Sequence, residues 1–273
     1  MEQHILSAEN LQLGYDGRVI VDGMETVIPD GKISIIIGAN GCGKSTLLKS
    51  FARLLRPMSG VVTLDRRPIG SYQPKKLAQV LGLLPQSPVV PEGIKVADLV
   101  ARGRFPYRKL LQNVTKEDMR AVQDALEIMG ITELCDRSVD ELSGGQRQRV
   151  WIALALAQQT DILLLDEPTT YLDIAYQVEI LDSLAELNQS KATTIVMVLH
   201  DINLSARYAD WLFAMRKGKL LAQGEPGDIL TPELIKEVYG LDCVVMEDPV
   251  SCTPYVVPKG RYHMNTHDKR MSK

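Results

Sequence analysis

The sequence has no hydrophobic run long enough to cross a membrane. A spanning helix needs about 20 apolar residues, whereas the longest runs here have the length of a strand, as in residues 194–199. Residues 1–4 are polar and lack the layout of a secretory signal peptide. We therefore expect a cytoplasmic protein, unless a partner holds it at a membrane.

The sequence also has few cysteines and a small net charge. The cysteines form no C-x-x-C pair and have no cluster of histidines beside them, so a zinc site is not expected. In a cytoplasmic protein they are expected to be free thiols; they are Cys42, Cys135, Cys243 and Cys252. The net charge of −3 argues against a nucleic-acid partner. A hydrophobic content of 45% over 273 residues still predicts a full core.

A glycine-rich stretch, residues 38–46, organises the rest of the chain. It follows the apolar run 33–37 and precedes the helix-like run 47–52, so the order is strand, loop, helix. The stretch meets the pattern G-x-x-x-x-G-K-[ST] of a nucleotide-triphosphate site. Glycines let backbone N–H groups converge on phosphate oxygens, and the helix that follows adds its positive dipole end.

This loop supplies the predicted ATP ligands. Lys44 brings a mobile positive charge to the β- and γ-phosphates, and the Ser45 hydroxyl can bind Mg²⁺. The residues of the loop predicted to bind ATP are Gly38, Asn40, Gly41, Cys42, Gly43, Lys44, Ser45 and Thr46. Cys42 allows two interpretations: a small side chain that merely fits, or a thiol whose alkylation or oxidation blocks nucleotide binding.

The rest of the chain alternates between strand-like and helix-like segments. Residues 4–13 and 18–28 predict two antiparallel strands, and residues 87–160 contain helical runs near 116–129 and 145–159. Further strands are predicted at 32–37, 61–64, 80–84, 162–165, 193–199, 211–216 and 219–223, and further helices up to about residue 55, at 75–79, at 174–189, from about 202, at 226–230 and at 232–239. Strand–helix alternation predicts an α/β fold with a mainly parallel sheet and helices on both faces.

A second phosphate-binding pattern lies at residues 142–146. Ser143, Gly144 and Gly145 stand at the start of an amphipathic helix, and such a helix start is an anion site. One phosphate loop and one further helix start of this kind predict a sandwich of two copies. The loop of one copy would hold ATP, and the Ser-Gly-Gly of the other would close over the γ-phosphate.

With these motifs the sequence resembles the nucleotide-binding subunits of ATP-binding cassette (ABC) transporters. Residues 142–146 match the signature of that family, and the resemblance extends over residues 4–257. It implies the ABC ATPase fold: a P-loop NTPase core, an N-terminal antiparallel β-subdomain and an inserted α-helical subdomain. The domain prediction is a single ABC ATPase domain over 1–257, with 1–86 and 161–257 as the core and 87–160 as the helical subdomain, then a polar, disordered tail over 258–273.

Two adjacent carboxylates, Asp166 and Glu167, follow the apolar strand 162–165. Such a pair at the end of a buried strand is costly unless a cation offsets it. Neighbouring strand residues point to opposite sides, so one carboxylate can face a metal and the other a water molecule. The family resemblance implies that Asp166 binds Mg²⁺ and that Glu167 is the general base for the attacking water.

Other polar residues take their roles from the resemblance alone. Tyr15 resembles the aromatic that stacks on adenine, Gln86 the glutamine that touches Mg²⁺ or the attacking water, and His200 the histidine that orients water and the γ-phosphate. The implied catalytic residues are Glu167, His200 and Gln86, the metal ligands are Ser45, Gln86 and Asp166, and the residues that contact ATP of the other copy are Ser143, Gly144, Gly145, Gln146 and Asp173. The implied cofactors are ATP and Mg²⁺.

Residues 101–107 and 167–173 resemble more narrowly the bacterial iron(III)–siderophore importer ATPases. The resemblance implies transmembrane permease subunits that dock near residues 87–107, a second ATPase copy in a homodimer and, indirectly, a periplasmic or surface substrate-binding protein. It places the chain at the cytoplasmic side of the inner membrane. The same branch handles haem and cobalamin, so both stay open as cargo.

Two functions of other classes compete with transport. A soluble ABC ATPase that acts on ribosomes or DNA resembles tandem cassettes or carries long coiled-coil inserts, whereas this chain has one cassette and no sustained heptads. A small-molecule kinase shares only the phosphate loop and leaves residues 142–146 unexplained.

Overall fold

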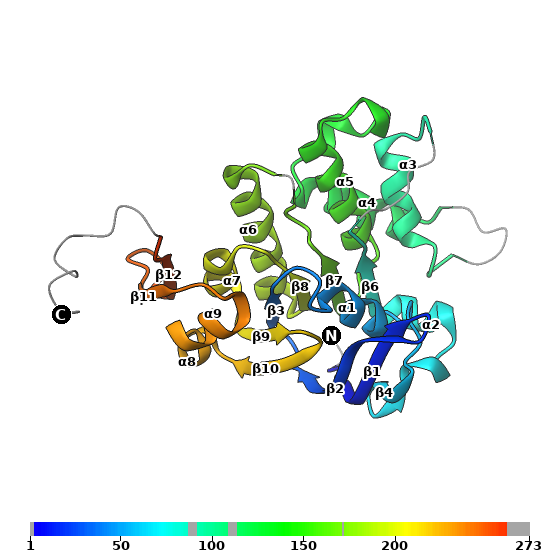
Figure 1. The fold of residues 1–273 in the computed structure, drawn as a ribbon. Helices are drawn as coiled ribbons and strands as arrows, with labels where there is room; N and C mark the ends of the chain where they lie inside the picture. The colour runs from blue at the N-terminus through cyan, green and yellow to red at the C-terminus, as the bar shows by residue number, and fades with distance from the viewer. Residues whose placement is uncertain (1–2, 87–91, 109–113, 171, 261–273) are drawn as a thin grey trace, which may run out of the picture.

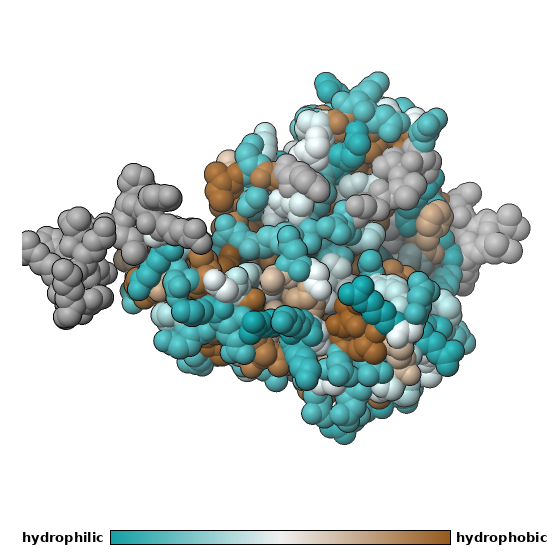
Figure 2. Space-filling view, viewed as in Figure 1, coloured by the Kyte–Doolittle hydropathy of each residue, from teal (hydrophilic) through white to brown (hydrophobic). Residues whose placement is uncertain are grey.

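The computed structural model describes residues 3–86, 92–108, 114–170 and 172–260. The tail predicted at 258–273 and the docking segment predicted at 87–107 therefore lie partly outside the described residues. Within these ranges, no helix is long and apolar enough to cross a bilayer. Hydrophilic side chains cover most of the face seen in Figure 2, and hydrophobic ones gather there in separate patches.

The centre of the molecule is a sheet with the strand order β10-β9-β3-β8-β7-β6 (Figure 1). Its strands are β3 (Ile33–Gly38), β6 (Leu81–Leu84), β7 (Ile162–Asp166), β8 (Thr194–Val198), β9 (Trp211–Arg216) and β10 (Lys219–Gly224). The strands from β9 to β6 run parallel, whereas β10 pairs antiparallel with β9. Nearly continuous apolar runs form the parallel strands because both faces of such a sheet are covered.

A second sheet is antiparallel, with the order β2-β1-β4-β5. It consists of β1 (Leu6–Tyr15), β2 (Arg18–Ile28), β4 (Ser59–Leu64) and β5 (Arg67–Pro68). Asp16 and Gly17 connect β1 to β2 with φ values of 49° and 79°, which is the positive-φ pair that a tight two-residue hairpin turn requires. The two antiparallel strands predicted from the sequence are thus present, and the short β5 is an addition.

The helices pack around these sheets, and three of them form a separate block. The helices are α1 (Lys44–Phe51), α2 (Pro74–Val80), α3 (Val96–Ala101), α4 (Lys116–Ile128), α5 (Gly144–Ala157), α6 (Ile174–Lys191), α7 (Ile202–Tyr208), α8 (Pro226–Ile229) and α9 (Pro232–Tyr239). In Figure 1, α3, α4 and α5 lie together above the sheet, within the segment predicted as a helical subdomain. The exact limits of that subdomain stay a prediction.

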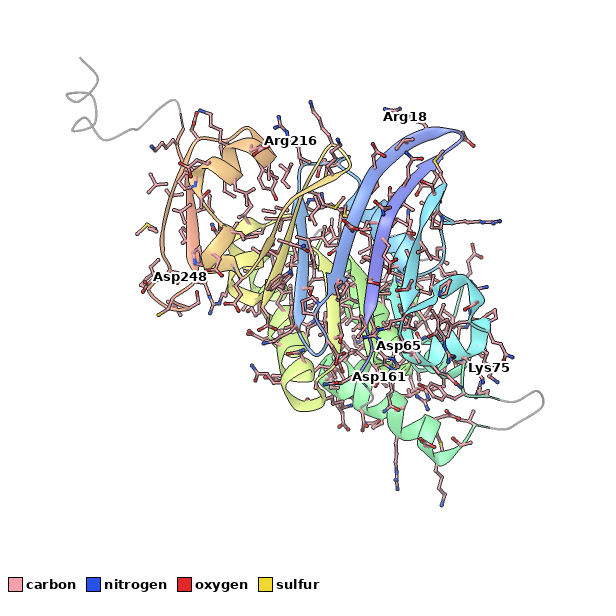
Figure 3. The ribbon with its side chains drawn as sticks, turned by 90° about the horizontal axis from the view of Figure 1, so that it is seen from below. Arg18, Asp65, Lys75, Asp161, Arg216 and Asp248 are labelled. Atoms are coloured by element: carbon pink, nitrogen blue, oxygen red, sulfur yellow. The ribbon has the colours of Figure 1, made fainter. Side chains whose placement is uncertain are left out.

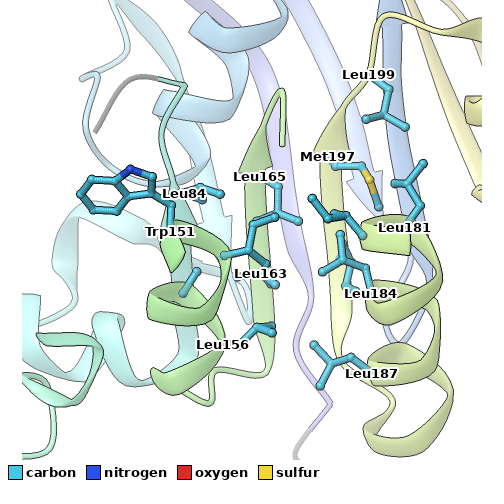
Figure 4. Packing of buried hydrophobic residues seen from close by; sticks show 14 of the residues in the cluster. Leu84, Trp151, Leu156, Leu163, Leu165, Leu181, Leu184, Leu187, Met197 and Leu199 are labelled. Carbon is cyan, nitrogen blue, oxygen red and sulfur yellow. The ribbon is translucent and has the colours of Figure 1, made fainter. Parts of the chain in front are cut away.

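Hydrophobic side chains pack on both faces of the central sheet. Ile35 and Ile37 of β3 join one cluster with α5, α6 and α7, whereas Ile36 joins a second cluster with α1 and the antiparallel sheet. Figure 4 shows part of the first cluster, where Leu181 and Leu184 of α6 face strands β7 and β8. Helices therefore lie on both faces, as predicted, although α1 shares its face with the strands of the second sheet.

A C-terminal hairpin was not predicted from the sequence. It consists of β11 (Cys243–Glu247) and β12 (Pro254–Pro258), and it packs against α7. The Asn203 side chain of α7 accepts a hydrogen bond from Val256 N at 2.7 Å and donates one to Val256 O at 3.3 Å. These strands are short, and their residues alternate between buried and exposed, which gives a weaker signal than the fully apolar strands of the sheet.

His4 connects the start of β1 to two other segments. No role was predicted for this residue from the sequence. Its ring is buried, with Nδ1 2.8 Å from Asp65 Oδ2 and Nε2 3.3 Å from Asp161 Oδ2. Figure 3 shows these two aspartates side by side, although they are far apart in the sequence. The three side chains hold the N-terminal strand, the end of β4 and the start of β7 together.

Candidate active site

A cleft of about 580 Å³ opens where β3 and β7 end. Its walls are formed by Tyr15, Ile20, Asn40, Gly41, Gly43, Lys44, Ser45, Thr46, Gln86, Glu167, Thr170 and His200. Of the residues predicted for this chain's own half of the site, all but Gly38, Cys42 and Asp166 line the cleft. The fold thus brings together segments that the sequence separates by more than one hundred residues.

The phosphate loop depends on glycine at two of its positions. Gly43 has a φ of 109° immediately before α1, a conformation that residues with a Cβ rarely adopt. A Cβ on Gly38 would lie 2.3 Å from the carbonyl oxygen of Met215 on β9. These glycines let the loop turn tightly from β3 into α1, so that the helix begins at the cleft.

Lys44 is folded back onto its own loop. Its Nζ donates hydrogen bonds to Gly38 O at 2.8 Å and to Ala39 O at 3.3 Å, and its side chain is buried. Both acceptors are neutral carbonyls, so the ammonium charge has no carboxylate among these hydrogen-bond partners. This positive charge at a helix N-terminus suits the cleft to an anion such as a phosphate.

Cys42 lies beside the cleft but does not line it. Its side chain is buried in the hydrophobic cluster of α1 and the antiparallel sheet. Burial raises the pKa of the thiol, although the positive charge of Lys44 acts in the opposite direction. Since the reactive form is the thiolate, this environment favours the interpretation of a small side chain that fits. A contact with ATP would go through the backbone.

Asp166 is almost completely buried at the end of β7. It is 2% exposed, and its Oδ1 accepts a hydrogen bond from Ser45 Oγ at 2.8 Å. Burial raises the pKa of the Asp166 carboxyl, the neighbouring Glu167 raises it further, and the hydrogen bond from Ser45 opposes both. A hydroxyl and a carboxylate side by side are the oxygen ligands that Mg²⁺ prefers when substrate phosphates and water complete its shell. The donor set therefore fits this ion.

Glu167 is held by three side chains from three segments. His200 Nε2 lies 2.8 Å from its Oε1, while Gln86 Nε2 and Thr170 Oγ1 donate to its Oε2 at 2.7 Å and 3.1 Å. Burial would raise the pKa of Glu167, but His200, Thr170 and Gln86 together lower it below its ordinary value. Glu167 also has a φ of 56°, a strained conformation for a residue with a side chain. The carboxylate is thus fixed, ionised and directed into the cleft.

The sequence analysis missed two residues of the cleft wall, Ile20 and Thr170. Thr170 follows Glu167 by three residues within segment 167–173, which the sequence analysis singled out for its resemblance, and that spacing was the available signal. Ile20 lies on β2, opposite the end of β1 that carries Tyr15. Tyr15 is 45% exposed, so these two side chains offer an apolar end of the cleft suited to a flat base.

The predicted trans residues do not reach the cleft of their own chain. Ser143 caps α5: its Oγ accepts from Gln146 N at 3.3 Å, and its N–H donates to Gln146 Oε1 at 3.1 Å. Asp173 caps α6 by accepting from Tyr176 N at 3.2 Å. None of the predicted trans residues, Ser143, Gly144, Gly145, Gln146 and Asp173, is among the residues that line the cleft. Their predicted contact with ATP stays a prediction, and it needs a second copy.

Comparison with known proteins assigns this fold and cleft to a class. Residues 21–170, more than half of the chain, match the family described as "ABC transporter". The matched segment contains the phosphate loop, the start of α5, β7 and Glu167. The chain belongs to this family as an ATP-binding subunit, and it is an ATPase.

The relatives narrow the class. The chain is 52% identical to the ferric enterobactin transport ATP-binding protein of Escherichia coli, over 94% of each chain. It is 50% identical to the achromobactin transport ATP-binding protein of Dickeya dadantii, over 94% of this chain and 95% of the other. It is 48% identical to a petrobactin import ATP-binding protein of Bacillus anthracis, over 95% of each chain.

Solved structures agree with the fold. The chain resembles a metal-chelate type ABC transporter in an inward-facing conformation with a TM-score of 0.81 and 31% identity, over 94% of this chain and 98% of the other. It resembles a dimeric bacterial ABC transporter cassette with a TM-score of 0.72 and 26% identity, over 81% of this chain and 98% of the other. The predicted ABC ATPase fold is confirmed.

Proposed function

We propose that this chain is the ATP-hydrolysing subunit of a bacterial importer for iron(III)–siderophore complexes. The observation that carries the proposal is the 52% identity, over 94% of both chains, with a protein named for ferric enterobactin transport. The relatives named for achromobactin and petrobactin, at 50% and 48% identity over similar lengths, support the same substrate class. ATP hydrolysis in the cleft supplies the free energy of uptake.

Glu167 is the general base of the proposed mechanism. The lowered pKa of Glu167 keeps its carboxylate ionised and able to accept a proton from the attacking water. His200 holds Oε1 through its Nε2, and its side chain lines the cleft, where it orients water and the γ-phosphate. Gln86 and Thr170 hold Oε2, so both carboxylate oxygens have a fixed direction.

Lys44 and the end of β7 act on the phosphates. The Lys44 ammonium exchanges its two carbonyl acceptors for the β- and γ-phosphates, which draw it more strongly because they are charged. Asp166 and Ser45 would hold Mg²⁺, which neutralises charge on phosphate oxygens. Tyr15 and Ile20 cover the adenine at the apolar end of the cleft.

A second copy of the chain completes the site. At the start of α5, Ser143 and Gly144 are exposed and Gly145 is half-buried, and none of the three lines the cleft of its own chain. They can therefore close over the γ-phosphate bound by another copy. Asp173, at the start of α6, lies in the same contact. The likeness to a dimeric ABC cassette supports this assembly. Closure excludes water from the reacting groups and strengthens their electrostatic effect.

Membrane permease subunits are the remaining partners. The described residues contain no membrane-spanning helix, and the relatives carry names of transport and import proteins. The chain works as a peripheral subunit at the cytoplasmic side of the membrane, bound to permeases near residues 87–107, of which the structure describes 92–107. A substrate-binding protein on the other side delivers the iron complex.

Uptake of radioiron tests the proposal. Cells whose sole copy carries Lys44→Ala are compared with parent cells, using iron-loaded siderophores in one arm and haem and cobalamin in two others. Loss of siderophore uptake alone is the expected result. Normal siderophore uptake together with loss of haem or cobalamin uptake would show that the cargo is haem or cobalamin and not a siderophore. If uptake is unchanged in all three arms, in a strain that has no other gene for such an ATPase subunit, the proposal of an importer is wrong.

A further inference from the structure

Another cavity, of about 250 Å³, lies at the opposite end of β7 from the ATP cleft. It is bounded by the last turns of α5 and α6 and by the start of β7. Figure 4 shows three of the residues that line it, Leu156 of α5, Leu163 of β7 and Leu187 of α6. None of the residues around this cavity lines the ATP cleft, so the two are separate sites.

The apolar part of the wall is buried. It consists of Ala155, which contributes only a methyl group, and of the three leucines. Well-packed interiors seldom leave a void larger than a water molecule. An engineered cavity of about 150 Å³ with a similar apolar lining stays dry and binds benzene. The wall of this cavity therefore suits the apolar body of a ligand.

The polar side chains of the wall include no carboxylate. They are Gln159, Thr160, Lys191 and Thr193. Thr193 is 4% exposed, and among the described residues its backbone oxygen, but not its hydroxyl, takes part in a side-chain hydrogen bond, which Asn188 Nδ2 donates at 2.8 Å. A buried hydroxyl in the wall of a cavity is costly unless it finds a partner, and a polar group of a ligand would supply one.

The amide of Gln159 is oriented by Arg104. Arg104 Nη1 donates to Gln159 Oε1 at 3.1 Å, and because arginine has no acceptor, the amide oxygen must face it. The N–H groups of the amide are thus left for another acceptor. Gln159 also has a φ of 52° just after the end of α5, a conformation that glycine adopts more easily. The chain therefore holds a glutamine side chain at this place in spite of the strain.

Lys191 supplies a positive charge. It is the last residue of α6, its side chain is exposed, and none of the ion pairs among the described residues includes it. An ammonium, an oriented amide and a free hydroxyl can all donate hydrogen bonds. The head group that matches them accepts hydrogen bonds and carries a negative charge, because charged acceptors form the stronger bonds.

We propose that this cavity binds a small monocarboxylate with an apolar chain. The chain packs against the leucines, and the carboxylate accepts hydrogen bonds from Lys191, Gln159 and Thr193. Scaled from the cavity of about 150 Å³ that takes the six carbons of benzene, this one holds roughly ten non-hydrogen atoms, which is the size of octanoate. Such a site is independent of the cargo of the importer and of bound ATP.

Calorimetric titration of the full chain with octanoate tests the site. Octanoate is expected to saturate it with a Kd of about 0.1–1 mM, within what a ligand of this size can gain. Octylammonium has a similar body but the opposite charge, so it should bind at least about fivefold more weakly. An excess of ATP with Mg²⁺ should not displace octanoate, because the ATP cleft shares no lining residue with this cavity.

Lys191→Gln tests the head group. Loss of an exposed charge should weaken octanoate binding by about twofold to fivefold, while binding of octan-1-ol, which carries no charge, stays unchanged. Lys219→Gln, at an exposed lysine of β10, is the matched control and should change neither affinity.

Ala155→Leu tests the body of the ligand. The larger side chain occupies the space between the helices, so binding of both octanoate and octan-1-ol should be lost. Extra methylene groups in a packed core are themselves destabilising, so the folded state of this variant is checked by its circular dichroism. If the variant does not fold, the comparison of Lys191→Gln with Lys219→Gln decides.

Four results would overturn the proposal. Octanoate that shows no saturable binding would remove the site, and displacement of octanoate by ATP would place it in the ATP cleft. Equal affinities for octanoate and octylammonium, or an unchanged octanoate affinity in Lys191→Gln, would exclude an anionic head group. Full binding of octanoate by folded Ala155→Leu would place the ligand elsewhere on the chain.

Discussion

Two buried aspartates, Asp118 in α4 of the helical block and Asp166 at the end of β7, differ in what the chain provides for them. Asp118 is 4% exposed and Asp166 is 2% exposed. Burial acts to raise the pKa of both, but hydrogen bonds from Arg104 and Thr115 bring the pKa of Asp118 below its ordinary value. For Asp166, burial and the negative charge of Glu167 outweigh the hydrogen bond from Ser45, so the pKa of Asp166 is raised.

The difference lies in the counter-charge. Arg104 is paired with Asp118 at 2.9 Å, whereas Asp166 receives a hydrogen bond from the uncharged hydroxyl of Ser45. Lys44 is close in the sequence to Ser45, but its ammonium bonds to backbone carbonyls instead. A carboxylate that the fold buries without a cation is costly for stability. A carboxylate of this kind fits a site that binds a cation, and for that reason Asp166 is a candidate for function.

The largest expected effect concerns the carboxylate beside Asp166. Glu167→Gln should still bind ATP, because the cleft keeps its shape, but should hydrolyse it about 10²–10⁴-fold more slowly, since the proposed general base is lost. Phosphate release and equilibrium binding of ATP measure the two properties separately. Glu186→Gln, at an exposed position of α6, serves as the control. Unchanged turnover would remove Glu167 from the role of base.

The next largest effect should come from breaking the pair that the chain completes itself. Arg104→Met leaves Asp118 buried without its cation, and breaking a buried pair in this way costs about 3–5 kcal/mol. Denaturant unfolding of the ATP-free protein measures the loss. Arg120→Met is the control, with an expected change within about 0.5 kcal/mol. A loss of similar size in both variants would contradict the comparison.

The reciprocal substitution sharpens the contrast. Asp166→Asn removes a charge that the fold buries at a cost, so the ATP-free protein should gain between zero and about 2 kcal/mol of stability at neutral pH. Because the pKa of Asp166 is raised in the folded state, this gain should disappear as the pH falls through that pKa. A ligand at one hundred times its Kd stabilises the protein that binds it by about 2.7 kcal/mol. The parent protein should gain this stabilisation from Mg²⁺-dependent ATP binding, and Asp166→Asn should lose it.

Asp118→Asn is the matched variant of this experiment. Since the pKa of Asp118 is lowered on folding, its ionised form stabilises the protein at neutral pH, and that contribution is lost as the pH falls through the folded pKa. The variant should therefore be less stable than the parent at neutral pH, with the difference shrinking in acid. Equal responses of Asp118→Asn and Asp166→Asn would show that the counter-charge does not distinguish the two sites.

The smallest effect is expected at Thr170. Thr170→Val keeps the shape but removes the hydroxyl that donates to Glu167 Oε2 at 3.1 Å. That hydrogen bond favours the ionised carboxylate, so the pKa of Glu167 should rise by less than about one unit. A base must be ionised to act, so the acid limb of the pH–rate profile should move to higher pH. Thr253→Val, in the loop before β12, should leave the profile in place.

Local patterns determined most of the fold and the chemistry of the cleft. The phosphate loop, the acidic pair after a buried strand and the serine–glycine helix start are each contained in a few consecutive residues, so their meaning does not depend on distant contacts. Apolar runs likewise predicted the parallel strands, because a strand covered on both faces must be apolar throughout. The weaker alternation of β11 and β12 left that hairpin unpredicted.

Tertiary structure alone decided which side chains meet. Gln86 reaches Glu167 across 81 positions of the sequence, and Arg104 reaches Ala157 across 53. The tertiary structure also decided that Cys42 faces the core, that Lys44 donates hydrogen bonds to backbone carbonyls and that Thr170 donates one to Glu167. Such contacts depend on how elements pack, which the periodicity of any one element does not encode. Local motifs of the sequence therefore determined which reaction the chain performs. The packing decided that Asp118 pairs with Arg104, whereas Asp166 accepts a hydrogen bond from the uncharged hydroxyl of Ser45.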